Sequence, residues 1–262
     1  MNIYEELFSV ADKTALVTGG AKGVGAFIAE SLVRAGCRVF VTGRSRDAGE
    51  TFARRMAAHG SCTYLQHDLA SPAQIEVLAA ELGRRAGAVD ILVNNAGSFN
   101  AADIASVKAE DWDSLMALNL RTPFLLVQAL MPLLTARASG ADPARIINIG
   151  SIGGLMPQSN GAYAYGCSKA AVHQLTRMLA SDLRASNINV NAIAPGFFPS
   201  DMTAGFFEAV PDLKQAVIGK IPAHRLGTAE DLGGMVIFLC SRAGAYLTGT
   251  ITQVDGGFLC AA

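Results

Sequence analysis

Seven compact apolar runs are the strongest feature of the hydrophobic pattern along this chain. Each is a short stretch of apolar residues, which indicates a buried strand. We expect strands at Lys13–Thr18, Arg38–Thr42, Cys62–Gln66, Asp90–Val93, Arg145–Ile149, Ile188–Ile193 and Ile251–Val254.

Amphipathic segments separate these runs and predict helices. We expect them at Ala26–Ala35, Asp47–His59, a segment opened by Ser71 and Pro72, Asp111–Arg137, Tyr165–Arg184 and Ala229–Cys240. Pro123 and Pro132 interrupt the long segment, so a kink is expected near Asn119–Pro123. Residues 1–12 are expected to be a short lead-in.

Strands that alternate with helices throughout predict an α/β fold, in which a doubly wound parallel sheet carries helices on both faces. Residues 1–262 should form a single domain, in which residues 197–228 are a long connection that we interpret as a substrate lid. In such sheets, ligands bind outside the C-terminal ends of the strands. Six candidate features follow predicted strands and should meet at that edge: Gly19–Gly25, Arg44, Asp68, Asn94–Gly97, Ser151 and Pro195–Gly196.

A glycine-rich turn joins the first expected strand to the first expected helix. Gly19, Gly23 and Gly25 allow a tight turn and a close approach of the backbone to a pyrophosphate. The helix N-terminus adds free N–H groups and a positive dipole. The turn, which also contains Lys22 and Val24, therefore predicts a phosphate-binding site.

The end of the second expected strand indicates which dinucleotide binds. An acid there would hold the ribose 2′-hydroxyl of NAD, whereas an arginine suits the 2′-phosphate of NADP. Gly43 and Arg44 stand at this position, and Lys22 adds a second cation near the first turn. NADP(H) is therefore the expected cofactor. NAD(H) is the alternative if Arg44 is only a solvated surface charge.

Ser151, Tyr165 and Lys169 bring candidate chemistry to the same edge. Tyr165 and Lys169 are four residues apart and lie on one helical face. An ammonium group one turn away favours a phenolate, and lowering a phenol pKa to about 7 requires roughly 4 kcal/mol. Taken alone, the pair is better explained as part of an ordinary helix, and it is the strand-end features around it that favour a catalytic role.

The amino-acid composition limits the kinds of partner that this chain is expected to bind. Hydrophobic residues make up 51% of the chain and charged residues 16%, so part of the apolar surface is expected against other subunits. The net charge of −1, without a basic run, argues against binding to nucleic acid.

No apolar run is long enough to cross a bilayer and no signal peptide is evident, so no membrane partner is expected. Five cysteines without metal-ligand spacing indicate reduced thiols, a cytoplasmic location and no metal site.

Several of these residues together resemble the short-chain dehydrogenase/reductase family over nearly the whole chain, and within it the 3-oxoacyl reductases. They are Gly19–Gly25, Asn94–Gly97, Asn119, Ser151, Tyr165, Lys169 and Pro195–Gly196. The resemblance implies a Rossmann-type fold. It also implies a homotetramer, or a homodimer, with the helices Asp111–Arg137 and Tyr165–Arg184 at the contact.

The resemblance also implies roles for single residues. Tyr165 would exchange a proton with the substrate oxygen, which Ser151 would polarise. Lys169 would bind the nicotinamide ribose and lower the pKa of Tyr165, and Asn119 would hold a relay water. The expected cofactor contacts are Gly19, Lys22, Gly23, Val24, Gly25, Arg44, Asp68, Leu69, Asn95, Ala96, Gly97, Tyr165, Lys169, Pro195, Gly196 and Ser200.

We therefore predict an NADPH-dependent oxidoreductase that reduces a ketone to a secondary alcohol. The Phe-rich segment 197–207 fits a 3-oxoacyl-like or other apolar substrate, and it fits a lid packed on the core or a contact between subunits about equally well. Ser186 stands near where fatty-acid reductases of the family carry an arginine for docking acyl carrier protein, which argues against carrier-bound substrates. One alternative is an NAD(P)-dependent dehydrogenase of a polyol, sugar acid or aromatic alcohol. Another is a cofactor-binding scaffold or sensor, although a scaffold has no need of a tuned phenol.

Overall fold

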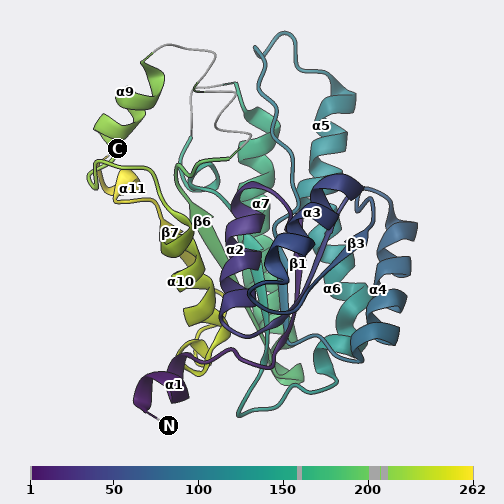
Figure 1. Cartoon of the computed structure of the whole chain (residues 1–262). Coiled ribbons are helices and arrows are strands. Elements are labelled where there is room, and N and C mark those ends of the chain that lie inside the picture. The colour runs from purple at the N-terminus through teal and green to yellow at the C-terminus, as the bar shows by residue number, and fades with distance from the viewer. Residues whose placement is uncertain (1, 158–160, 201–206, 208–211, 262) are drawn as a thin grey trace.

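The computed structural model describes residues 2–157, 161–200, 207 and 212–261. Within these residues, seven parallel strands form one sheet with the order β3-β2-β1-β4-β5-β6-β7 (Figure 1). The strands are β1 (Thr14–Thr18), β2 (Arg38–Gly43), β3 (Cys62–Gln66), β4 (Ile91–Asn94), β5 (Ala144–Ile149), β6 (Ile188–Pro195) and β7 (Ile251–Val254). The predicted α/β fold is confirmed, and the expected strands are present with small differences at their ends.

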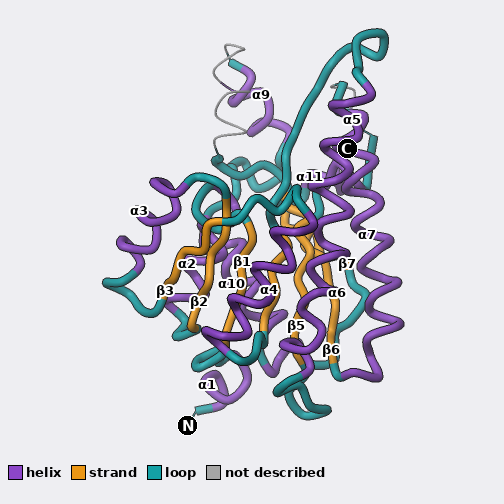
Figure 2. The backbone as a smooth tube through the Cα atoms, turned by 90° about the vertical axis from the view of Figure 1, so that its right-hand side faces the viewer, coloured by secondary structure: helices purple, strands orange, loops and turns teal. Residues whose placement is uncertain are grey.

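Helices cover both faces of this sheet (Figure 2). One face carries α2 (Gly23–Arg34), α3 (Arg46–Met56) and α10 (Ala229–Cys240), and the other carries α4 (Pro72–Ala86), α6 (Thr122–Thr135) and α7 (Tyr163–Leu183). Successive residues of β1 point to opposite faces, so that Val17 belongs to the first core and Leu16 to the second. Burial on both faces explains why the strand sequences are almost continuously apolar.

The strand order changes direction at β1. This strand pairs with β2 on one side, where Thr18 lies opposite Thr42, and with β4 on the other, where Val17 lies opposite Val93. The chain connections therefore lead away from each other on the two sides of this point. Such a switch point opens a crevice at the C-terminal ends of the adjacent strands.

The predicted kink in the long helical segment is a π-helical turn. The segment runs from α5 (Ala109–Met116) through η1 (Ala117–Arg121) into α6. Pro123 falls in the first turn of α6, where a missing backbone N–H costs little. By length and composition alone, Ala109–Thr135 would be able to span a membrane. Leu126 and Leu130 of α6 are buried in the core on the sheet, which is where an apolar helix of a globular domain belongs.

The N-terminal lead-in contains a helix that the sequence analysis missed, α1 (Ile3–Phe8). The side chain of Asn2 accepts hydrogen bonds from the backbone N–H groups of Tyr4 and Glu5, and the Glu5 carboxylate accepts one from the Asn2 N–H. This capping box was visible in the sequence, because an Asn followed three residues later by a Glu commonly starts a helix.

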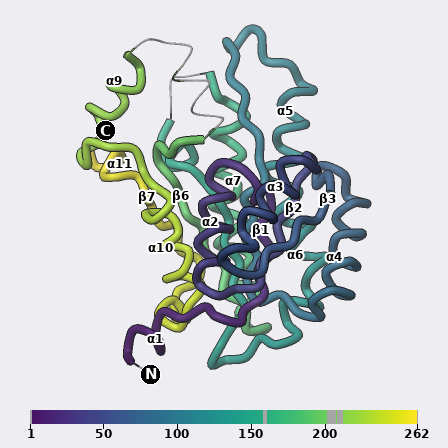
Figure 3. Tube along the Cα trace, in the orientation of Figure 1, coloured from purple at the N-terminus to yellow at the C-terminus, as the bar shows by residue number. Residues whose placement is uncertain are grey.

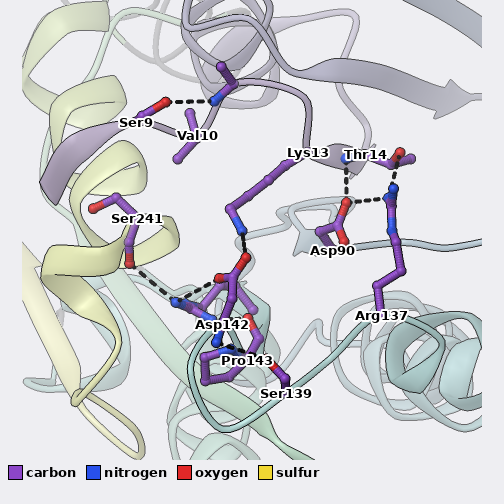
Figure 4. A network of polar contacts seen from close by, with 12 residues as sticks. Ser9, Val10, Lys13, Thr14, Asp90, Arg137, Ser139, Asp142, Pro143 and Ser241 are labelled. Atoms are coloured by element: carbon purple, nitrogen blue, oxygen red, sulfur yellow. Dashed lines mark hydrogen bonds and ion pairs between the residues drawn. The ribbon is translucent and has the colours of Figure 1, made fainter. Parts of the chain in front are cut away.

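A polar network ties the N-terminal ends of the strands together (Figure 4). Asp142 accepts a hydrogen bond from Lys13 at 2.5 Å and lies 3.6 Å from the fully buried Arg145. Arg145 also donates to the backbone carbonyl of Ser241 at 3.2 Å. The start of β5 is thereby fixed to the start of β1 and to the end of α10.

The opposite end of the molecule carries α9 (Leu213–Lys220) and the C-terminal α11 (Phe258–Ala261), far from α1 (Figure 3). Three short helical turns complete the described elements: η2 (Ile152–Gly154), η3 (Arg184–Ser186) and η4 (Arg242–Gly244). Of the predicted lid at 197–228, residues 201–206 and 208–211, which include Met202 and Phe206, lie outside the described residues. The described part of the lid lies beyond the C-terminal ends of the strands.

Candidate active site

A cavity of about 670 Å³ opens at the C-terminal ends of β1, β4, β5 and β6. Most of the predicted site residues line it. They are Gly19, Lys22, Gly23, Val24, Gly25, Asn95, Ala96, Gly97, Ser151, Tyr165, Lys169, Pro195, Gly196 and Ser200. Residues far apart in the sequence therefore meet at one edge of the sheet.

The turn between β1 and α2 requires glycine at three positions. Gly19 has a φ of +62° and Gly23 a φ of +51°, a region that residues with a Cβ rarely adopt. A Cβ at Gly25 would lie 2.3 Å from the carbonyl oxygen of Gly19. Because α2 begins at Gly23, its free N–H groups and the positive end of its dipole lie at the cavity wall. The turn fits a pyrophosphate group.

Asn95 braces the switch point between β1 and β4. Its side-chain amide donates to the carbonyl of Thr18 at 2.8 Å. The Thr18 hydroxyl in turn accepts hydrogen bonds from the backbone N–H groups of Asn95 and Ala96, both at 2.9 Å. These bonds hold the Asn95–Gly97 backbone against the glycine-rich turn, so the two segments form one continuous wall of the cavity.

Ser151 is held at the end of β5 by the turn that follows it. Its hydroxyl accepts a hydrogen bond from the backbone N–H of Gly153 at 3.0 Å and caps the η2 turn. The preceding Gly150 donates its N–H to the carbonyl of Ile193 on β6 at 2.7 Å. The hydroxyl also hydrogen-bonds the Tyr165 phenol. The Ser151 side chain is therefore fixed beside the phenol in a site that is largely buried.

Lys169 occupies the next turn of α7 after Tyr165. Its ammonium nitrogen lies 5.6 Å from the centre of the Tyr165 ring and donates to the carbonyl of Ile149 at 2.7 Å. The side chain is 6% exposed. Removal from water disfavours the ammonium form and lowers the pKa of Lys169 to about 8.

The expected low pKa of Tyr165 is not found in the protein without ligands. Burial raises the pKa of the phenol, and the hydrogen bond with Ser151 opposes this effect. Desolvation of the phenol is the larger of these two effects. In the ligand-free protein the pKa of Tyr165 is therefore raised rather than lowered. An added positive charge near the phenol would shift the balance toward the phenolate.

Asn119 lies in the π-helical turn and is 2% exposed. Its side-chain oxygen accepts the backbone N–H of Ser98 at 2.8 Å, and its amide donates to the Ser98 carbonyl and to the Ser168 hydroxyl. Asn119 is thus behind the described cavity lining rather than in it. These bonds fix the segment after Gly97 to α7 just beside Lys169.

Arg44, Asp68 and Leu69 are the other predicted cofactor contacts outside the described cavity lining. Arg44 is exposed just past the end of β2, and its carbonyl accepts a hydrogen bond from the Gln66 side chain at 3.1 Å. The Asp68 carboxylate accepts the backbone N–H of Ala70, as a turn residue does, and the Leu69 carbonyl accepts the Thr122 hydroxyl at 2.7 Å. These residues flank the cavity on the β2 and β3 side of the sheet.

The cavity also has an apolar wall that the sequence alone did not reveal. Its members are Phe99, Ile152, Met156, Pro157, Leu213, Val217 and Phe258. Phe99 meets the Tyr165 ring edge-on at 5.1 Å between ring centres. Of the Phe-rich segment 197–207, which was considered as a substrate contact, Phe197 and Phe198 line the cavity. The other members of the wall were missed because hydrophobicity alone cannot separate a cavity wall from the core. Tyr163, the tyrosine two residues before Tyr165, is 44% exposed and does not belong to the described lining.

Among the described residues, no group of three or more His, Cys, Asp or Glu side chains is arranged to hold a metal ion.

Comparisons with known proteins agree with the geometry of this cavity. A family model described as enoyl-(acyl carrier protein) reductase matches residues 19–259. The rhamnolipids biosynthesis 3-oxoacyl-(acyl-carrier-protein) reductase of Pseudomonas aeruginosa is 45% identical over 251 residues, which cover 96% of this chain and 98% of that protein. These matches extend across the glycine-rich turn, Ser151, Tyr165 and Lys169.

Solved structures are similar over the same length. The Pseudomonas aeruginosa RhlG/NADP active-site complex matches with a TM-score of 0.93 and 45% identity, covering 97% of this chain and 98% of that chain. A gluconate 5-dehydrogenase from Burkholderia cenocepacia, in complex with NADP and tartrate, matches with a TM-score of 0.90 and 31% identity, covering 98% and 99%. Both similar structures contain NADP.

Proposed function

Since the chain belongs to the short-chain dehydrogenase/reductase family of oxidoreductases, we propose that it uses NADPH to reduce a ketone, 3-oxoacyl-like or similarly apolar, to a secondary alcohol. The observation that carries this proposal is the group Ser151, Tyr165 and Lys169 in a cavity that also has a glycine-rich wall and an apolar wall. A scaffold or sensor would not need this group.

Tyr165 is proposed as the proton donor. Its phenol gives a proton to the substrate oxygen, and the Ser151 hydroxyl, already hydrogen-bonded to the phenol, polarises that oxygen. When bound, NADPH supplies the hydride. Lys169 stabilises the phenolate that Tyr165 becomes, since its ammonium lies 5.6 Å from the ring centre. We assign Asn119 to the water that returns the proton, and its π-helical turn supports this because such turns are frequent at functional sites.

The proposed cofactor site begins at the glycine-rich turn. Gly19–Gly25 would hold the pyrophosphate, and the Asn95–Gly97 backbone would run along the dinucleotide. Arg44 and Lys22 would bind the 2′-phosphate. Gly43 supports this placement, because a Cβ there would meet no described atom within 4 Å and the space beside the end of β2 is open. The NADP in the two similar structures supports the same choice over NAD.

The apolar wall favours an apolar substrate. Phe99, Met156, Val217 and Phe258 offer hydrocarbon and aromatic surface to whatever occupies the space next to Tyr165. A 3-oxoacyl chain would bury its methylene groups there, each with a gain of about 0.8 kcal/mol. The name of the Pseudomonas aeruginosa relative points to the same substrate class.

A second candidate function is oxidation of a sugar acid with NADP. The similarity to a gluconate 5-dehydrogenase favours it. The described lining speaks against it, because a polyhydroxylated substrate would need several hydrogen-bonding side chains beyond the catalytic group. Most of the wall opposite the glycine-rich turn consists instead of apolar side chains. The ketone reductase therefore has the stronger support.

We also propose a homotetramer in the cytoplasm. Exposed apolar side chains support the assembly, since Phe124 on α6 is 45% exposed and Met178 on α7 is 56% exposed, on the two helices expected at the contact. Free cysteines, including the exposed Cys167 and Cys260, support a reducing compartment. Sedimentation equilibrium of the purified protein tests the assembly, and a monomer at micromolar concentration would contradict it.

The function is tested by cofactor binding followed by turnover. NADPH and NADH are titrated against the purified protein by fluorescence, and oxidation of the tighter one is then followed with a ketone panel that includes a 3-oxoacyl thioester. We expect preference for NADPH and reduction of the 3-oxoacyl compound. Oxidation of gluconate with no reduction of any apolar ketone would replace this proposal by the second candidate.

A further inference from the structure

Phe258 brings the C-terminal segment of the chain into the cavity. It is the first residue of α11, and its ring lines the cavity together with Phe197, Leu213 and Val217. The rings of Phe258 and Phe197 meet edge-on, with 5.2 Å between centres and 74° between planes. Phe197 directly follows Gly196, which is part of the proposed cofactor wall. Phe258 is therefore placed at the boundary between the cofactor wall and the lid.

The turn before Phe258 has a conformation that holds the ring in place. Gly256 and Gly257 have φ angles of +64° and +88°, which favour glycine. The Asp255 carboxylate accepts the backbone N–H groups of Gly257 at 2.9 Å and Leu259 at 3.0 Å, so it caps α11. The direction in which Phe258 leaves the turn is thereby fixed by the backbone.

This turn is also packed against the base of the lid. The carbonyl of Gly256 accepts the backbone N–H of Ala223 at 3.0 Å, just after α9. A Cβ at Gly256 would lie 2.8 Å from the side chain of Ile221, and one at Gly257 would lie 3.2 Å from Pro222. On its other side, Gly196 approaches Asp255 so closely that a Cβ would lie 2.8 Å from the Asp255 Cα. The C-terminal turn therefore joins the lid to the cofactor wall.

From this arrangement we infer that Phe258 determines substrate specificity by closing the acyl end of the pocket. The inference rests on the proposed reduction of an apolar ketone. Phe258 is a rigid ring on a fixed turn, between a wall that must stay in place for the cofactor and a helix, α9, that contributes Leu213 and Val217. Its size limits how many methylene groups of a chain fit beyond the reacting carbonyl. Phe258 is thus a specificity residue that takes no part in the proton transfer.

If the size of the Phe258 side chain limits the length of the substrate, smaller and larger side chains at this position should change the chain-length preference in opposite directions. Phe258→Ala removes the ring and makes room for additional methylene groups, whereas Phe258→Trp fills the same space further. Each methylene that is buried instead of exposed is worth about fourfold in kcat/KM. The ratio of kcat/KM for long over short substrates should therefore rise at least about tenfold in the alanine variant and fall in the tryptophan variant. A merely structural role would not move the ratio in opposite directions.

The test uses the full chain and a series of 3-oxoacyl N-acetylcysteamine thioesters, from 3-oxobutyryl to 3-oxododecanoyl, with NADPH. The wild type, both Phe258 variants and Phe8→Ala are compared. Phe8 is a partly exposed aromatic residue on α1 at the far end of the molecule, so this control should keep the wild-type ratio. The thermal unfolding temperature and the NADPH affinity of each variant are measured as checks on folding and on the cofactor wall.

The outcomes separate this inference from the proposed function. If the wild type reduces the series and both Phe258 variants keep its chain-length ratio, the inference is overturned while the function stands. If the wild type reduces none of the thioesters, the proposed function fails. In that case the role of Phe258 is tested by binding, from the rise in unfolding temperature that octanoate and dodecanoate each produce in the presence of NADP⁺. If the rise with dodecanoate relative to octanoate becomes larger in Phe258→Ala and smaller in Phe258→Trp than in the wild type, the inference is supported. If this difference is the same in all three proteins, the inference is overturned.

Discussion

The ammonium nitrogen of Lys169 lies 2.7 Å from the carbonyl oxygen of Ile149, so a buried cation on α7 is tied to the last residue of β5. Ser151 follows that strand by two residues, and Tyr165 is one helical turn before the lysine. One hydrogen bond therefore sets the position of the helix relative to the strand that carries the serine.

Replacing Tyr165 with phenylalanine tests the proton donor directly. Tyr165→Phe removes only the hydroxyl, so we expect kcat to fall by roughly 10²–10⁴-fold, the range for loss of a general acid. NADPH affinity should stay within about threefold, as the ring and its neighbours are kept. Tyr163→Phe is the matched control, because Tyr163 is two residues away on the same helix and 44% exposed. Near-normal turnover in Tyr165→Phe would remove the catalytic assignment.

Burial of Lys169 should leave a signature in the pH dependence of stability. The pKa of this lysine falls from 10.5 to about 8 in the folded protein, so the unfolded chain binds more protons between these values. The folded state is therefore progressively penalised as the pH falls from about 10.5 to about 8, by about 3 kcal/mol in total. Lys169→Met should not lose this stability, because methionine has no group that takes up a proton.

The measurement is the difference in unfolding free energy between Lys169→Met and the wild type, from urea melts of the ligand-free proteins at several pH values from 8 to 10.5. We expect the difference to grow in favour of the variant as the pH falls through this window and to be constant below it. Lys108→Met, at an exposed lysine before α5, should give a flat difference. A flat difference for Lys169→Met as well would show that the lysine is not desolvated.

Arg44 is expected to select NADPH. It is exposed beside the open space at Gly43, where it can form a charge-assisted hydrogen bond with a 2′-phosphate. Arg44→Ala should weaken NADPH binding by about 10- to 100-fold, which corresponds to 1.5–3 kcal/mol, and leave NADH binding nearly unchanged. Arg46→Ala is the control, since Arg46 is two residues away and engaged with Glu50 at 2.9 Å. The two affinities are measured by fluorescence titration. An unchanged ratio between the cofactors would show that Arg44 does not contact the phosphate.

The type and order of the buried elements along the chain could be predicted because each depends on its own local sequence. The apolar run of β3 and the helix start at Ser71 and Pro72 were recognisable without tertiary information. The glycine-rich turn was recognisable too, because its backbone conformation restricts which residues can occupy it. α1 was missed although its capping residues were visible, because a helix of six residues has no extended hydrophobic pattern.

The apolar wall of the cavity could not be predicted in the same way. Phe258 and Val217 line it only because a C-terminal turn packs against residues 221–223 after α9, and that contact joins segments with no local relationship. The ligand-free pKa of Tyr165 also depends on burial, which a sequence spacing does not contain. The spacing of residues in the sequence predicted which side chains meet in the site. The extent to which those side chains are removed from water could be seen only in the folded structure.

His173 provides a last test, because it is a buried base in direct contact with the turn that carries Ser151. It follows Lys169 by one helical turn, is 2% exposed, and lies so close to Gly150 that a Cβ there would be 2.1 Å from the imidazole. Burial, with a further contribution from the Lys169 charge, lowers the pKa of His173 from 6.5 to about 4. The imidazole is therefore neutral in the folded protein at neutral pH.

Stability should consequently fall as the solution is acidified. Between pH 6.5 and about 4 the unfolded chain takes up a proton that the folded chain resists, so the wild type should lose about 3 kcal/mol over this window from this group alone. In His173→Gln the loss should be absent, while His224→Gln, at an exposed histidine, should keep it. Urea melts at pH 7, 5.5 and 4.5 measure the difference. If His173→Gln retained the full acid sensitivity of the wild type, folding would not hinder proton uptake by the imidazole, and His173 would be protonated in the folded protein at acid pH. The turn beneath Ser151 would then carry a charge close to Lys169, which is incompatible with the burial on which the proposed site depends.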